Sequence, residues 1–159
     1  MQTNGKSNDK LFKETEEKVK QWLTDEDFKY GRNTNESGFV WSWDATGPGG
    51  FGCSFAQAVG HPESLWLALT MMLDPYQRDI NALGPEQSKD LLFTLRQRLL
   101  ALGIRFDLGP NLISITLREQ VFTETMTRET FCRGLNRVRR SADCAKWTLD
   151  EKLPEPAAN

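Results

Sequence analysis

The segment from residue 38 to residue 73 constrains the fold most, because it holds three consecutive strand-like stretches, and in the first two the apolar residues alternate with period two. These stretches are residues 38–45, 51–59 and 64–73, and glycine and proline residues separate them. Such alternation is typical of β-strands joined by turns. The third stretch, SLWLALTMML, is apolar on both of its faces, so it predicts a strand in the centre of a sheet.

Helical periodicity appears before and after these strands. Residues 11–23 carry apolar side chains at helical spacing among glutamate and lysine residues, and residues 128–150 carry a narrow apolar seam. Residues 84–103 predict a helix with Pro85 at its first position and Gly103 as its C-terminal cap. Three helices are therefore predicted.

Two further strands are predicted within residues 104–117, which alternate on either side of the turn GPN. The run DFKYGR could add a short strand before residue 38. The expected fold is α+β, an antiparallel sheet of about five strands with three helices in the order α-β-β-β-α-β-β-α. We expect a disordered N-terminal segment at residues 1–9, a single domain at residues 10–150 and a flexible tail at residues 151–159.

Composition bears on the class of protein. A net charge of -2 argues against a globally basic nucleic-acid binder. The longest apolar run, residues 65–73, is about half as long as a membrane helix, and the N-terminus lacks the apolar region of a signal peptide. Three cysteines without a close pair, Cys53, Cys132 and Cys144, indicate free thiols in a reducing compartment. We therefore expect a cytoplasmic protein that does not bind membranes.

The stretch TGPGGFG contains the spacing G-x-G-x-x-G at Gly47, Gly49 and Gly52. In dinucleotide-binding folds a helix begins at the third glycine, and its N-terminus holds the pyrophosphate. Here the residues that follow alternate as a strand, and the next strand carries no lysine of the kind that a kinase glycine loop requires. We interpret the glycines as a turn between two strands and predict no cofactor.

Catalytic and metal-binding patterns are sparse. His61 is the only histidine, and Cys53 precedes it in the chain. A thiol–imidazole pair could act as a nucleophile and base, but no third group is evident to orient the imidazole. The chain contains neither H-x-x-x-H nor paired cysteines nor an EF-hand loop. We predict no catalytic residues and no metal site, with an enzyme built on Cys53 and His61 as a distant alternative.

The predicted helix at residues 84–103 carries apolar residues beyond its core side. Phe93 and Leu100 lie about 100° or more from the centre of the core arc on a helical wheel. Loops of the same chain could bury them. Alternatively, they form a self-association patch. In a twofold dimer each copy contributes its two apolar side chains, so that four lie in the interface. The core arc consists of Leu91, Leu92, Leu95, Leu99 and Leu102.

The C-terminal helix carries a basic stripe opposite its apolar seam. Arg133, Arg137 and Arg140 recur at i, i+4 and i+7, and Trp147 lies on nearly the same side. Like charges at this spacing repel, so they do not stabilise the helix locally. The stripe is either a solvated face, with Glu129 pairing Arg133 and Trp147 folded onto the sheet, or a face that binds an acidic protein segment or RNA.

The strand at residues 38–45 places three aromatic side chains on one side, Phe39, Trp41 and Trp43. We expect this ridge to lie in the core beneath the helices, because exposing three large aromatic side chains to water is unfavourable. If it faces outward instead, it forms a platform for an extended peptide.

Three stretches carry a resemblance to a known fold: ETEEKVKQWL, LLFTLRQRLLALGIRFDLGP and TRETFCRGLNRVRRSADCAKWTL. With the order of the elements, they resemble the type III secretion chaperone-like superfamily, and more narrowly an uncharacterised family of small cyanobacterial and archaeal proteins. The resemblance covers most of residues 11–150 and contains no catalytic motif. It implies a cytoplasmic homodimer that binds an extended segment of another protein.

The residues and the resemblance together predict a non-enzymatic, chaperone-like homodimer with a protein or peptide partner. The alternative function is a nucleic-acid-binding protein that uses the Arg-rich face of the C-terminal helix, and the net charge weighs against it.

Overall fold

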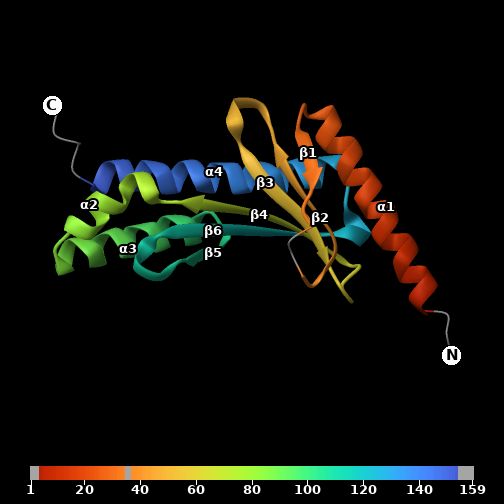
Figure 1. The fold of residues 1–159 in the computed structure, drawn as a ribbon, viewed down its shortest axis with the longest axis horizontal. Coiled ribbons are helices and arrows are strands. Elements are labelled where there is room, and N and C mark those ends of the chain that lie inside the picture. The colour runs from red at the N-terminus through yellow and green to blue at the C-terminus, as the bar shows by residue number, and fades with distance from the viewer. Residues whose placement is uncertain (1–3, 35–36, 154–159) are drawn as a thin grey trace. The chain divides into compact units, whose positions relative to one another are not determined.

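The computed structural model describes residues 4–34 and 37–153. These residues form four α-helices and six β-strands (Figure 1). The helices are α1 (Asn4–Asp25), α2 (Gln77–Ala82), α3 (Pro85–Ala101) and α4 (Arg128–Lys152). The strands are β1 (Lys29–Arg32), β2 (Phe39–Thr46), β3 (Gly52–Ala58), β4 (Ser64–Met72), β5 (Arg105–Leu108) and β6 (Ser114–Phe122).

The strands form one sheet in the order β1-β2-β3-β4-β6-β5. The pairs β1–β2, β2–β3, β3–β4 and β5–β6 are antiparallel, so the predicted α+β class is confirmed. The strand that is apolar on both faces, β4, lies inside the sheet as expected.

The predicted count of about five strands and three helices is too low for the residues that the structure describes. The additional elements are the edge strand β1 and the helix α2. Four residues in β1 and six in α2 are too few to display a clear period in the sequence. α1 begins at Asn4, inside the segment that the sequence predicts to be disordered, while residues 1–3 and 154–159 lie outside the described residues.

Contacts divide the described residues into two compact units, whereas the sequence predicts a single domain. Unit 1 comprises the residues up to Ala68 together with Glu119–Leu135. Unit 2 comprises Leu69–Arg118 together with the residues from Asn136 onward. The elements β4, β6 and α4 each contribute residues to both units.

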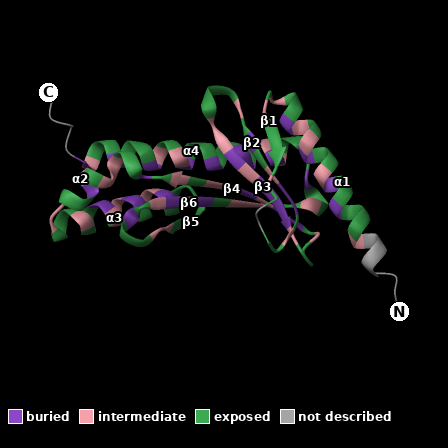
Figure 2. Ribbon diagram, viewed as in Figure 1, coloured by how far each residue is buried: buried purple, intermediate pink, exposed green. Residues whose placement is uncertain are grey.

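Phe131, in the first turn of α4, lies at the centre of the core of unit 1. Its ring centroid lies 5.4 Å from that of Trp22 on α1 and 5.6 Å from that of Phe55 on β3. On the same helix as Trp22, Val19 and Leu23 are fully buried, and Figure 2 shows buried positions alternating with exposed ones along α1. The amphipathic pattern of residues 11–23 therefore serves to bury one side of α1.

A buried hydrogen-bond network stabilises the turn between β3 and β4. The Trp41 indole Nε1 donates to Gln57 Oε1 at 2.9 Å, and Gln57 Nε2 donates to the Pro62 carbonyl at 3.0 Å. Thr123 Oγ1 donates to the same carbonyl at 2.7 Å. Gln57 is completely buried, and these two bonds satisfy an acceptor and a donor of its own amide and give the Trp41 indole its partner.

The glycine-rich stretch is a turn between β2 and β3, as the sequence predicts. Gly49 and Gly50 have φ angles of 74° and 77°, a region that favours glycine. The residues after the turn pair with β2 as an antiparallel strand, so no helix N-terminus is present there to hold a phosphate. A Cβ at Gly47 would lie 2.5 Å from the Phe28 ring, which explains why this corner excludes a side chain.

Leucines along one side of α3 form the core of unit 2. Leu91, Leu95 and Leu99 are buried, as are Ile115 and Leu117 on β6. The buried residues that α4 contributes to this unit are Val138, Ser141, Ala145, Thr148 and Leu149.

Polar contacts fix α3 against α4 at the border of this core. Arg98 Nη1 donates to Thr148 Oγ1 at 3.0 Å and pairs with Glu151 Oε2 at 2.7 Å. Lys152 Nζ lies 2.7 Å from Asp90 Oδ2. These contacts fix the rotation of α3 and therefore which of its residues face solvent.

We predict that Gln57→Met destabilises the protein by about 2–4 kcal/mol, because the Trp41 indole and the Pro62 carbonyl both lose a buried partner. The same substitution at Gln21, which is exposed on α1 and bonds Asp25, should change the free energy of unfolding by less than about 0.5 kcal/mol. Chemical denaturation followed by tryptophan fluorescence measures both values. Equal effects at the two positions would show that the buried network contributes nothing.

Candidate functional site

Phe93 and Leu100 lie on the solvent side of α3, opposite the buried leucines of unit 2. Each side chain is 62% exposed, so the described chain does not bury them and the alternative of burial by its own loops is excluded. Arg96 and Gln97 lie between them in the sequence and are also exposed. Two large apolar side chains within a polar surface are a typical anchor for another protein.

The α4 residues predicted as a partner face lie in both units. Arg133 belongs to unit 1, and Arg137, Arg140 and Trp147 belong to unit 2. Arg133 Nη2 lies 2.6 Å from Glu129 Oε1, as expected for a solvated face. Trp147 is 69% exposed, so the expectation that it folds onto the sheet is wrong. The structure offers no observation that favours nucleic-acid binding by this helix.

The structure does not bring Cys53 and His61 together as a catalytic pair. Cys53 lies near the start of β3 and His61 follows its end, which places them roughly 17 Å or more apart along the strand. His61 Nδ1 instead contacts Glu63 Oε1 at 3.0 Å on the surface. Burial raises the pKa of the Cys53 thiol to about 12, so it is not a ready nucleophile.

Metal ligands do not cluster in the part of the chain that the structure describes, where no three His, Cys, Asp or Glu side chains converge on one point. Among the same residues, no helix is long and apolar enough to cross a membrane.

The aromatic ridge predicted on β2 is divided by an irregularity in the strand. The register of β2 against β3 shifts between Phe39 and Trp41. Trp41 is buried, and Trp43 is half-buried with its Nε1 donating to Glu16 Oε1 on α1 at 2.8 Å. The prediction of a core ridge is thus correct for Trp41, whereas Phe39 is only half-buried.

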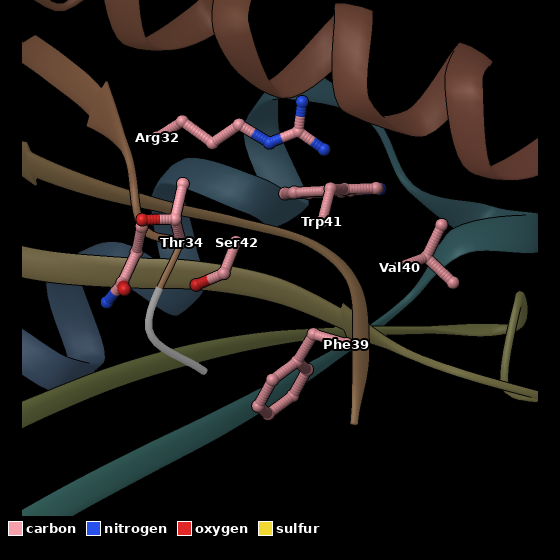
Figure 3. A pocket seen from close by; sticks show the side chains of 7 residues that line it. Arg32, Thr34, Phe39, Val40, Trp41 and Ser42 are labelled. Carbon is pink, nitrogen blue, oxygen red and sulfur yellow. The ribbon is translucent and has the colours of Figure 1, made fainter. Parts of the chain in front are cut away.

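A pocket of about 320 Å³ opens where the ridge is interrupted. Figure 3 shows Arg32 and Trp41 at one end of it, Phe39 at the other, and the Ser42 and Thr34 hydroxyls between them. The described residues that line it are Arg32, Asn33, Thr34, Phe39, Val40, Trp41 and Ser42. The pocket lies entirely within unit 1, and its volume is at the small end of the range for ligand sites.

The described lining of this pocket combines three apolar side chains with three neutral polar side chains and one cation, Arg32. Among the residues that the structure describes, Arg32 forms no ion pair and no carboxylate lines the pocket. Asn33 Nδ2 donates to Asp44 Oδ2 at 3.0 Å, and Ser54 Oγ donates to Asp44 Oδ1 at 2.6 Å, so the Asp44 carboxylate is satisfied by neutral donors. This pocket does not follow from the sequence, because only the possible strand DFKYGR points to Arg32 and no pattern places it beside Phe39.

Comparison with known proteins places the chain among uncharacterised relatives. Residues 15–149 match the family described as "Uncharacterized conserved protein (DUF2299)". A crystal structure of an uncharacterized protein from Methanothermobacter thermautotrophicus is similar, with a TM-score of 0.79 and 20% identity, and the match covers 87% of this chain and 98% of that chain. A search of curated proteins finds no match. The uncharacterised family expected from the sequence is therefore confirmed.

A second solved structure is similar over a comparable length. A chain in the crystal structure of the ExsC-ExsE complex matches with a TM-score of 0.43 and 15% identity, covering 98% of this chain and 100% of that chain. The fold itself is shown by the more similar structure from Methanothermobacter thermautotrophicus.

We predict that a thiol reagent at about pH 8 modifies Cys132 and Cys144 in the native protein and reaches Cys53 only after denaturation. Cys53 is buried, while the other two are half-buried. Because the pKa of Cys53 is raised to about 12 from 9.0, the stability linked to its protonated form is complete below pH 9 and is lost as the pH rises toward 12.

A thiol reagent that releases a chromophore is used, and the absorbance of that chromophore gives the number of thiols that have reacted. Cys53→Ala should leave the native count unchanged and lower the denatured count by one thiol. Rapid reaction of all three cysteines in the folded protein would contradict the burial of Cys53.

Proposed function

The chain belongs to this uncharacterised conserved family, and we propose that it is a non-enzymatic protein-binding module that forms a homodimer and binds a segment of another protein. The observation that carries the proposal is the pair of exposed apolar side chains on α3. Phe93 and Leu100 are each 62% exposed, although the helix already buries a separate row of leucines.

The spacing of these two residues suits a twofold contact between two copies of α3. In an antiparallel pair of helices centred between Arg96 and Gln97, Phe93 of one copy lies opposite Leu100 of the other. The patch on one copy then contacts the identical patch on the other copy, as a twofold interface requires. A helix face with two large apolar residues two turns apart also fits the ridges and grooves of a second helix.

The expected free energy of this contact is modest. Fully burying a large apolar side chain contributes about 1.5–3 kcal/mol, so four such side chains that are each largely exposed beforehand contribute roughly 4–7 kcal/mol. Association also has an entropic cost. We therefore expect a dimer that dissociates on dilution unless neighbouring residues extend the contact.

Binding to a second protein is supported by two further observations. The sequence resembles chaperone-like proteins that bind extended segments, and unit 1 carries a partly apolar pocket that no described side chain fills.

We predict that Phe93→Asp and Leu100→Asp each shift the protein from dimer to monomer, because each places two uncompensated carboxylates in the apolar contact. Sedimentation velocity over about 1–100 µM measures the shift. Leu11→Asp is the matched control, since Leu11 is an exposed residue at 46% on a different helix, α1.

The control variant should sediment as the wild type does. A wild-type protein that remains monomeric at the highest concentration would overturn the homodimer. A dimer that both α3 variants leave intact would place the interface elsewhere.

A further inference from the structure

We propose that the pocket of unit 1 receives a bulky apolar side chain from a partner segment and that Arg32 pairs with an acidic residue next to it in that segment. This inference rests on the proposed protein-binding function and names the chemistry of the partner. The pocket is lined by residues of β1, β2 and the turn that follows β1.

The volume and walls of the pocket support the binding of an apolar side chain. An apolar cavity of about 150 Å³ is enough to hold a benzene ring, so 320 Å³ accommodates one large side chain and part of its backbone. Phe39, which is half-buried, supplies most of the aromatic wall, because Trp41 is only 3% exposed, and Val40 adds an aliphatic surface that is 39% exposed. Burying an apolar group here removes apolar area on both partners from water.

The charges around the pocket support the pairing of Arg32 with an acidic residue of the partner segment. Arg32 reaches over Trp41 in Figure 3, and neither Arg32 nor Lys29 on the same strand pairs with a described carboxylate. Asp44, which accepts hydrogen bonds from the lining residue Asn33 and from Ser54, forms no ion pair with Arg32. The Arg32 guanidinium is therefore open to an acidic residue of a partner segment.

A rigid base under the pocket favours recognition without rearrangement. The Trp41 indole is fixed by its hydrogen bond to the buried Gln57, so the wall that it forms is present before any ligand arrives. Preformed walls reduce the entropic cost of binding.

Three short fluorescein-labelled peptides test the proposed chemistry by fluorescence anisotropy with the full chain. The first alternates aspartate with phenylalanine, the second alternates lysine with phenylalanine, and the third alternates aspartate with serine. We expect binding of the first peptide only, with an affinity that falls as salt rises. Equal binding of the first two peptides, or no binding of the first, would overturn the inference.

A pair of variants locates the site. Arg32→Glu should weaken binding of the aspartate–phenylalanine peptide about tenfold or more, because attraction becomes repulsion. Lys29→Glu adds the same charge change on the same exposed strand but outside the pocket lining, and its effect should stay within about threefold. Equal losses in the two variants would show that binding depends only on net charge.

A spectroscopic measurement separates the pocket from other surfaces. The indole N–H resonance of Trp41 in a ¹⁵N-labelled sample should shift on addition of the first peptide, whereas that of Trp147, on α4, should not. A shift confined to Trp147 would overturn the assignment to this pocket. The peptide tests do not depend on the α3 contact. If the peptides do not bind, the proposal of a homodimer is unaffected. If the protein proves to be monomeric, the peptide tests of the pocket still apply.

Discussion

The packing of Phe131 between Trp22 and Phe55 is the contact on which the rest of unit 1 depends. It joins three segments that are distant in the sequence, namely α1, β3 and the start of α4. A helix gains most of its stability in a protein from such tertiary burial rather than from its own propensity. Without this contact α1 would lose the surface that orders it, and the strands beneath it would expose their apolar face.

The two cores leave two chemically different surfaces to solvent. On α3 the exposed residues Phe93 and Leu100 are apolar and are arranged along one helix face. The pocket on unit 1 is smaller, concave and combines aromatic walls with the guanidinium of Arg32. A surface that can pair with its own copy suits self-association, whereas a pocket whose cation pairs with no described carboxylate suits an occupant of opposite charge.

The elements with a long, regular period could be predicted from the sequence, and the pocket could not. Strands β2 to β4 alternate over seven to nine residues, and Pro85 begins α3 as expected. The exposure of Phe93 and Leu100 also follows from helical geometry alone. The pocket depends on a register shift after Phe39 and on the approach of Arg32 from a strand of four residues. Both are set by pairing between strands, which local periodicity does not encode.

The hydrogen bonds of Gln57 restrict which amino acids position 57 can hold in related sequences. The indole of Trp41 can only donate and the carbonyl of Pro62 can only accept. A residue at position 57 must therefore accept on one side and donate on the other, which a carboxylate or an ammonium group cannot do. Relatives that replace Gln57 are expected to replace the tryptophan at position 41 as well, so the two positions should change together during evolution.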